Sequence, residues 1–422
     1  MASPIGRAGP VTNYPSMDDR IESIKRSSTD RQAPGEEPPS LTHRTILTLL
    51  YARTLGNMAF RVLYPFLPAI ARGLDVSLEA AGRLVSVQGG VRVAAPLFGH
   101  LSDRYGRRRM MEVALLILIA ATSVVFFTGA YPAALIAFAG IGLARALYDP
   151  TVQAYVGDMV PYDRRARPFA LISMAWALSW LFGVPAGGWI IERWGWRTPW
   201  GVIALLLVTA LVGTHLFVPS ASHVTRPTRS YTAFTWRELL ARSHIRAALV
   251  TGFGIVFAVE NVFVVYGAFL EQRFALSVGA IGIVSIVVGL SELLAEGSTF
   301  AWTDRLGKKR SVIFGLVAFG VALLWLPFLS GALVPALAGF ALVFFCFEFT
   351  IVSFFPLVSE LAADARATAI SLNVASMGLA RLMAPLVGTF LFARVDALLP
   401  NALLSALVCL ASAGVLWRGV EK

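Results

Sequence analysis

Long apolar segments, separated by short charged breaks, fill the chain from about residue 44 onward. A helix needs roughly 20 consecutive apolar residues to cross about 30 Å of membrane hydrocarbon, and segments of that length recur throughout. The pattern therefore predicts an all-α membrane protein with twelve transmembrane helices. Their approximate ranges are 44–70, 79–101, 109–128, 132–159, 167–191, 199–217, 245–272, 278–303, 310–329, 332–361, 366–393 and 396–417.

The longest internal polar stretch follows the sixth predicted helix and separates two sets of six. Within it, residues 236–242 have the pattern of a short amphipathic helix at the membrane surface. The N-terminal region is rich in Pro, Ser and mixed charge and lacks the apolar run of a secretory signal, which predicts a disordered tail. The predicted divisions are an N-terminal tail at 1–44, a six-helix bundle at 45–218, a central loop at 219–244, a second six-helix bundle at 245–418 and a C-terminus at 419–422.

Composition supports a membrane protein, because 57% of residues are hydrophobic and only 14% are charged. The formal net charge of +11 would suggest a nucleic-acid partner in a soluble protein. Here the basic residues concentrate in alternate loops, which the positive-inside rule explains without nucleic acid. We therefore expect a multi-pass protein of the cell membrane with both termini and the central loop in the cytoplasm. The opposite loops hold only Arg72, Arg193, Arg197, Arg273 and Arg394.

An internal repeat supports the division into halves. The segment 102–109 (SDRYGRRR) recurs at 303–310 (TDRLGKKR), an offset of 303 − 102 = 201. The segment 185–188 (PAGG) corresponds to 385–388 (PLVG), an offset of 385 − 185 = 200. Two matches at nearly one offset indicate two similar, pseudo-symmetric halves.

The loop after the second predicted helix carries the most specific motif. Residues 99–108 (GHLSDRYGRR) resemble the loop signature Gly-x-x-x-Asp-Arg-x-Gly-Arg-Arg of the major facilitator superfamily at every defined position. The second copy departs from it, with Phe300 in place of the first Gly. The resemblance implies two six-helix bundles and a secondary transporter that works by alternating access. The residues it assigns to a conformational gate are Gly99, Asp103, Arg104, Gly106, Arg107 and Arg108 in the first copy and Asp304 and Arg305 in the second.

Three further segments extend the resemblance, and two of them are similar to drug/proton antiporters of the same superfamily. Arg145 resembles the membrane-embedded arginine of the superfamily, although Asp149 stands where Gly is usual. Residues 183–188 (GVPAGG) are similar to their Gly- and Pro-rich signature, with the proline displaced by one place, and 195–200 (GWRTPW) also resembles that group. This resemblance implies proton-coupled export of a small organic or amphiphilic solute.

Ionisable side chains fall near the middle of several predicted helices, where a charge costs at least about 2.5 kcal/mol. Such residues should face a central cavity or a partner helix. Guanidinium groups are suited to anions, whereas buried acids near like charges are suited to carrying protons. The residues predicted to bind substrate are Arg61, Arg92, Arg145, Asn57, Asp149 and Arg381; those predicted to carry protons are Glu260, Glu292, Glu296 and Glu348.

Spacing adds a second interpretation of the same residues. Residues four apart share a helix face, so Arg145 and Asp149 form one polar stripe and Glu292 and Glu296 another. Any of these charges can equally belong to a structural ion pair, such as Arg145 with Asp149 or Arg381 with a glutamate. No histidine falls near the middle of a helix, so proton coupling would depend on carboxylates.

Three functions remain open at this point. The leading one is proton-coupled export of a small organic solute by a monomeric transporter. The second is transport of an organic anion or lipid headgroup by symport or uniport, and the third is a non-transporting receptor or scaffold with the same fold. An enzyme is not expected, because the sequence shows no P-loop, metal-ligand cluster or nucleophile with a positioned base. Neither a cofactor nor a metal is expected, and the expected partners are the lipid bilayer, a small-molecule substrate and protons.

Overall fold

The computed structural model describes residues 41–94, 102, 104–160, 166–220 and 236–420. The predicted tail up to residue 40, most of the central loop, Gly99 and Asp103 lie outside the described residues. The described residues contain helices and no strands. In the first half the helices are α2 (His43–Arg61), α3 (Leu67–Gly73), α4 (Leu78–Gly90), η1 (Val91–Ala94), α6 (Arg107–Phe127), α7 (Tyr131–Met159), α8 (Ala166–Leu178), η3 (Ser179–Gly183), α9 (Val184–Trp194) and α10 (Thr198–Phe217).

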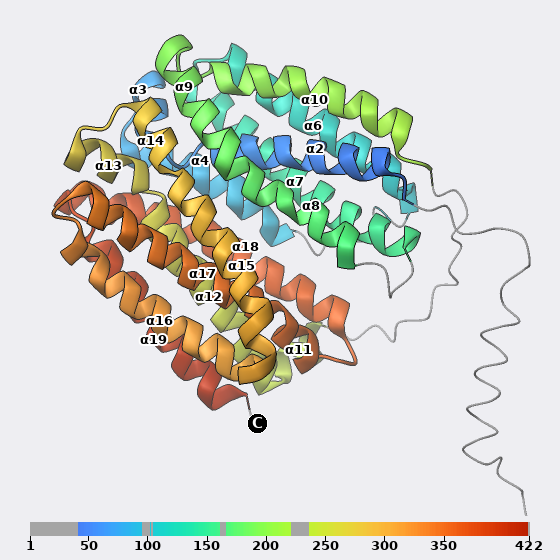
Figure 1. Ribbon diagram of the computed structural model, residues 1–422, viewed down its shortest axis with the longest axis vertical. Coiled ribbons are helices and arrows are strands. Elements are labelled where there is room, and N and C mark those ends of the chain that lie inside the picture. The colour runs from blue at the N-terminus through green and yellow to red at the C-terminus, as the bar shows by residue number, and fades with distance from the viewer. Residues whose placement is uncertain (1–40, 95–101, 103, 161–165, 221–235, 421–422) are drawn as a thin grey trace, which may run out of the picture. The chain divides into compact units, whose positions relative to one another are not determined.

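The second half repeats this organisation. Its helices are α11 (Trp236–Ala241), α12 (Ser243–Phe263), α13 (Tyr266–Phe274), α14 (Val278–Val284), α15 (Ile286–Leu306), α16 (Lys308–Leu329), α17 (Leu333–Leu361), α18 (Arg366–Val395) and α19 (Leu399–Gly419). The short helix α11 lies within the predicted amphipathic segment 236–242. Figure 1 follows the chain from α2 in blue to α19 in red.

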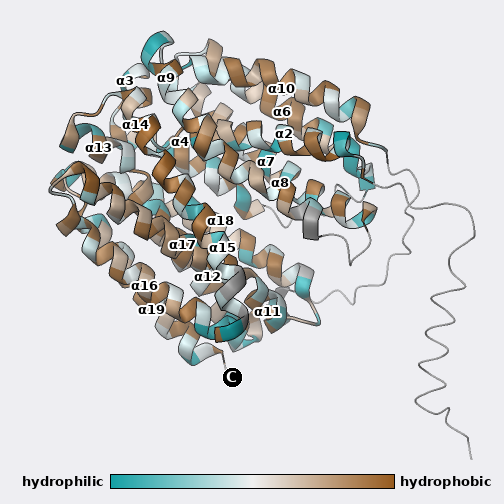
Figure 2. Ribbon diagram, in the orientation of Figure 1, coloured by the Kyte–Doolittle hydropathy of each residue, from teal (hydrophilic) through white to brown (hydrophobic). Residues whose placement is uncertain are grey.

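Each of the twelve predicted segments coincides with helical structure. Ten helices of the described part are long and apolar enough to cross a membrane. The first predicted span is broken after Arg61 and carries Arg44, Arg53 and Arg61, and the second is described only as far as Ala94. Side chains exposed on α10 and α16 are largely hydrophobic, including Leu205 and Phe328, as expected for surfaces that face lipid. Figure 2 shows hydrophobic residues along both helices.

Several predicted helices are interrupted where the sequence analysis expected continuous ones. Residues 62–66 form turns between α2 and α3, where Pro65 and Pro68 lack the amide hydrogen that a continuing helix requires. Residues 264 and 265 break the pattern between α12 and α13 at the corresponding place in the second half. Residues 179–183, which include Trp180, form a π-helix. Each turn of a π-helix contains more residues than a turn of an α-helix.

Glycines allow close packing between the two halves. α4 packs along α18, and α9 packs along α14. A Cβ atom added at Gly90 would lie 2.7 Å from the Leu382 side chain, and one added at Gly188 would lie 3.1 Å from the Cα of Gly282. Small residues permit such approach because backbones can come closer than larger side chains allow.

The end of α17 is tied to the start of α12 outside the membrane-spanning segments. Arg242 donates two hydrogen bonds to the Asp364 carboxylate, at 3.0 and 2.7 Å. These hydrogen bonds hold the pKa of Asp364 below its ordinary value. The pair therefore fixes the turn between α17 and α18 relative to the end of the central loop.

Candidate functional site

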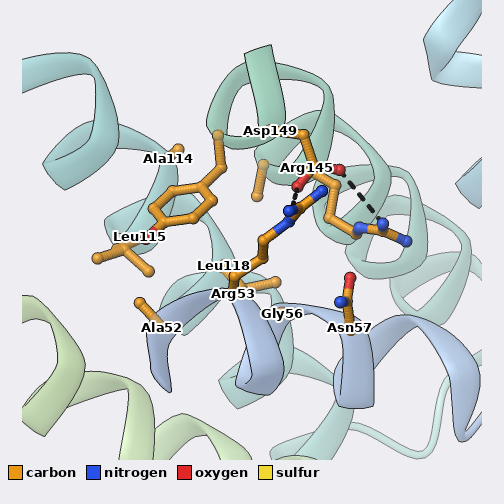
Figure 3. A pocket seen from close by; sticks show the side chains of 11 residues that line it. Ala52, Arg53, Gly56, Asn57, Ala114, Leu115, Leu118, Arg145 and Asp149 are labelled. Atoms are coloured by element: carbon orange, nitrogen blue, oxygen red, sulfur yellow. Dashed lines mark hydrogen bonds and ion pairs between the residues drawn. The ribbon is translucent and has the colours of Figure 1, made fainter. Parts of the chain in front are cut away.

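Asp149 on α7 is surrounded by three arginines from three helices of the first half. Its carboxylate oxygens lie 3.4 Å from Arg53 Nε, 3.4 Å from Arg92 Nη2 and 3.2 Å from Arg145 Nη2. Figure 3 shows Arg53 and Arg145 converging on Asp149 from α2 and α7. The pairing of Arg145 with Asp149 was one of the structural pairs considered from the sequence. One carboxylate serves three guanidinium groups, so this arginine cluster carries two positive charges in excess.

A small cavity adjoins the arginine cluster (Figure 3). Asn57 on α2 lines it and is 1% exposed, and neither polar atom of its side chain has a hydrogen-bond partner among the described residues. Two nitrogens of Arg145 and the Tyr148 hydroxyl are likewise unpartnered in this part of the chain. The cavity measures about 10 Å³, close to what one water molecule requires. An organic solute would need the surrounding helices to move apart.

Arg61 and Glu292 form a buried ion pair between the two halves. Arg61 Nη2 donates to Glu292 Oε2 at 3.1 Å, and the two side chains are 4% and 5% exposed. Two indole rings of the first half hold the same guanidinium group. Its Cζ lies 3.6 Å from the ring centroid of Trp176 and 4.4 Å from that of Trp180. The Arg61 charge is therefore shared between a carboxylate from one half and π faces from the other.

A second ion pair lies within the second half. Arg381 Nη1 on α18 lies 3.3 Å from Glu260 Oε1 on α12. This agrees with the pairing of Arg381 with a glutamate that the sequence analysis considered. The second carboxylate oxygen, Glu260 Oε2, is buried without a hydrogen-bond partner among the described residues.

Glu348 and Glu296 complete the acidic group. Glu348 on α17 is 7% exposed, and no hydrogen bond or ion pair joins its carboxylate to any other described residue. It lies within electrostatic range of Glu292, Glu296 and Arg61. Glu296 is half-buried and follows Glu292 by one helical turn. These are the two acids of the group without a direct cationic partner in the described chain.

The central charges balance when all are ionised. The five arginines are Arg53, Arg61, Arg92, Arg145 and Arg381, and the five acids are Asp149, Glu260, Glu292, Glu296 and Glu348. The positive and negative charges are, however, unevenly distributed within the site. Positive charge is in excess around Asp149, whereas unpaired negative charge lies at Glu348 and Glu296. Such a distribution can hold an anionic group at one place and exchange protons at another.

The two copies of the loop motif adopt matching backbone geometry. Gly106 precedes α6 with φ +89°, and Gly307 precedes α16 with φ +83°, a conformation that favours glycine. Arg107 lies 3.1 Å from Asp158 at the end of α7, and Lys308 lies 2.7 Å from Glu360 at the end of α17. The repeat therefore extends to the ion pair made at the same place in each half.

The other predicted gate residues take different positions. Arg108 Nε lies 3.0 Å from Glu112, one turn along α6. Arg104 is exposed beside the Tyr105 ring, Arg305 is exposed at the end of α15, and Asp304 lies in the same last turn. Asp158 and Glu360 could not be identified as partners from the sequence, because both stand about 50 residues from the motif.

Contacts between the halves gather at the end that holds α3, α9, α13 and α14. Arg72 Nη1 lies 2.6 Å from Glu271 Oε1, and the Tyr64 and Phe263 rings stack with centroids 4.7 Å apart. Gly267 lies against the carbonyl group of Pro65 so closely that a Cβ atom there would overlap it. The basic residues of these loops are evident from the sequence, but the pairing of Arg72 with Glu271 is not. This end is closed, and by the charge of its loops it is predicted to be extracellular.

In the part of the chain that the structure describes, two repeated sets of membrane-spanning helices around a buried group of charges indicate a polytopic membrane transporter. The sequence matches the Major Facilitator Superfamily over residues 49–295, which is more than half of the chain. The chain belongs to this superfamily. Its members are transporters and not enzymes, in agreement with the expectation from the sequence, and the receptor or scaffold interpretation is set aside.

Individual relatives agree with this assignment. The chain is 26% identical to the uncharacterized MFS-type transporter YwfA of Bacillus subtilis, over 68% of this chain and 71% of that protein. It is 29% identical to the tetracycline resistance protein, class C, of Escherichia coli, over 68% of this chain and 74% of that protein. The crystal structure of a D-xylose-proton symporter matches with a TM-score of 0.75 at 18% identity, covering 91% of this chain and 99% of that one. That match is one of fold.

Proposed function

We propose that this transporter exports a small organic solute in exchange for protons, by alternating access between its two six-helix bundles. The observation that carries the proposal is Glu348, a buried carboxylate without a cationic partner among the described residues. A lone charge in such a place is costly, whereas a protonated carboxyl group is not. Glu348 is thus suited to gain and lose a proton during the cycle.

The neighbouring Arg61–Glu292 pair supplies the link to movement. The pair joins α2 of one half to α15 of the other at 3.1 Å. Protonation of Glu292 would remove the charge that attracts Arg61, while Trp176 and Trp180 would retain the guanidinium group on the first half. The two halves could then part, and deprotonation would bring them together again.

The direction of transport and the orientation in the membrane are inferred from the relatives and from the loop charges. The similarity to a protein named for tetracycline resistance, together with the antiporter-like segments, favours export over import. The distribution of basic residues favours both termini in the cytoplasm, and we expect the transporter to act as a monomer. The proposed bundles are residues 45–218 and 245–418.

The test uses purified full-length protein in pyranine-loaded proteoliposomes, with tetracycline, ethidium and benzoate as test solutes. Glu348→Gln should lower solute-driven proton movement at least about tenfold, because the amide cannot take up a proton. It should retain solute exchange in the absence of a pH gradient. Glu192→Gln is the control, since Glu192 is an exposed acid on α9 outside the buried acidic group. Proton movement unchanged by Glu348→Gln would rule out the assigned role.

A second candidate is transport of an organic anion, which the arginine cluster favours. Arg53, Arg92 and Arg145 share the single carboxylate of Asp149, so an incoming carboxylate or phosphate could neutralise the excess charge. This function requires no proton and would leave Glu348 as a structural residue.

Ligand-dependent thermal stabilisation distinguishes the second candidate. Benzoate should raise the unfolding temperature of the unmodified protein, because it binds only the folded state, whereas ethidium should not. Arg92→Gln should reduce the benzoate effect at least about fivefold in apparent affinity, since hydrogen bonds to charged groups contribute about 1.5–3 kcal/mol. Arg83→Gln, on the exposed face of α4, is the control. Equal stabilisation of Arg92→Gln and the unmodified protein would argue against an anion at this cluster.

A further inference from the structure

A groove with mixed chemistry lies where α15 meets α16, away from the central charges. Its volume is about 470 Å³, and it is lined by Trp302, Arg305, Leu306, Arg310 and Phe314. Trp302 and Phe314 are 52% and 54% exposed. The five lining residues thus combine two arginines with three large apolar side chains and include no acid.

The polar and apolar parts of the groove are arranged in layers. α15 ends at Leu306 and α16 begins at Lys308, so Arg305 and Arg310 both lie near the helix ends. Trp302 precedes Leu306 by four residues and Phe314 follows Arg310 by four, which places each ring about 6 Å further from the loop. Charge therefore lies at the membrane boundary, and aromatic surface lies on the hydrocarbon side of it.

Among the described residues, no ion pair neutralises the positive charge of the groove. Lys308 pairs with Glu360, and Lys309 donates to the carbonyl group of Val420. Arg305 and Arg310 are exposed and form no ion pair or hydrogen bond with another described residue. Two guanidinium groups are therefore available to a ligand that approaches from the lipid.

We propose that this groove binds an anionic phospholipid of the surrounding leaflet. The phosphate would lie between Arg305 and Arg310, where guanidinium groups can donate paired hydrogen bonds to its oxygens. The first part of the acyl chains would cover Trp302, Leu306 and Phe314. A zwitterionic lipid gains less, because its own cationic group opposes the arginines. This site is separate from the transport pathway and does not depend on the proposed function.

The first half of the chain supplies a natural comparison. At the repeat offset of 201, Arg109 corresponds to Arg310 and is equally exposed. Val113 and Leu101 stand at the positions that correspond to Phe314 and Trp302. Arg109 thus has the charge without the two aromatic side chains, and it serves as the matched control.

The test is native mass spectrometry of the full-length protein in detergent with phosphatidylglycerol or phosphatidylcholine of the same acyl chains. The unmodified protein should retain phosphatidylglycerol preferentially. Arg310→Gln should weaken that binding about fivefold, and addition of Arg305→Gln should weaken it about fivefold again, as expected for one charge each near a membrane surface. Arg109→Gln should leave it unchanged, and Arg310→Lys should retain most of it.

Three outcomes would overturn the proposal. One is equal retention of the two lipids by the unmodified protein. Another is an equal loss with Arg109→Gln, which would indicate a general effect of basic residues. The third is full displacement of phosphatidylglycerol by millimolar inorganic phosphate, which would indicate a site for free phosphate. Because Arg310→Lys keeps the charge, lost binding in that variant together with a changed elution volume would reveal misfolding instead of a binding defect.

Discussion

Arg61 contacts a carboxylate and two aromatic ring faces. Both kinds of group stabilise a buried cation. Glu292 provides the carboxylate at 3.1 Å, and Trp176 provides the closer face at 3.6 Å. The pair is almost fully buried, so water solvates neither charge. Loss of one partner leaves the other buried and uncompensated, which is the costly case for ion pairs.

A double-mutant cycle tests this dependence. Arg61→Ala and Glu292→Gln should each lower the free energy of unfolding in detergent by about 3–5 kcal/mol. The double variant should lose less than the sum of the two, because neither charge is then left alone. Arg72→Ala is the control, since the Arg72–Glu271 pair also joins the halves but the Arg72 side chain is 59% exposed. That variant should lose no more than about 1 kcal/mol.

An additive cycle at Arg61 and Glu292 would contradict a direct interaction between them. Equal effects of Arg61→Ala and Arg72→Ala would show that burial does not decide the cost. In that case the Arg61–Glu292 pair could not serve as the link between protonation and movement.

At the residue scale, the sequence could predict charges inside the helices and a partner on the same helix, but not the specific partners on other helices. Of the charges expected inside helices, Arg61, Arg145, Glu260, Glu292 and Glu348 are at most 7% exposed, whereas Arg92, Asp149, Glu296 and Arg381 are partly buried. The pairing of Arg145 with Asp149 follows from helical spacing alone. The pairing of Arg61 with Glu292 joins residues 231 apart, so it depends on how the halves pack. Nothing in the local sequence contains that information.

At the scale of elements, apolar runs locate the helices well because length and hydrophobicity are local properties. The interruptions are harder to predict. Pro65 and Pro68 provide a reason for the break after α2, whereas residues 264 and 265 are both valine and give no such signal. The second break stands beside Gly267, which contacts the first half at Pro65. The break at residues 264 and 265 therefore coincides with a packing contact between the halves and not with a local helix-breaking residue.

The two breaks correspond through the repeat. Subtracting 201 from 264 and 265 gives 63 and 64, which lie in the turn between α2 and α3. Each half therefore places a broken helix at the closed end, where Tyr64 stacks on Phe263. Broken helices at membrane depth are tolerated where protein buries them, and all of residues 62–66 and 263–267 are buried. These segments are suited to change conformation when the closed end opens.

At the scale of the whole molecule, the described conformation is closed at the end that holds α3, α9, α13 and α14. Closing depends on close approach of the halves, most directly where Gly267 meets the Pro65 carbonyl group. A transporter that alternates between two conformations responds to any change that affects one of them more than the other. A side chain at position 267 can overlap Pro65 only while this end is closed.

Gly267→Val should therefore shift the population toward conformations in which this end is open. Spin labels at Arg193→Cys and Gln272→Cys, both exposed and on opposite halves, should report longer distances in the Gly267→Val background. Gly331→Val is the matched control, because a Cβ atom at Gly331 meets nothing within 4 Å. Identical distance distributions in the two glycine variants would mean that this contact does not control closure. A selective lengthening in Gly267→Val would identify the Pro65–Gly267 contact as a steric determinant of the closed state, independently of any solute or proton.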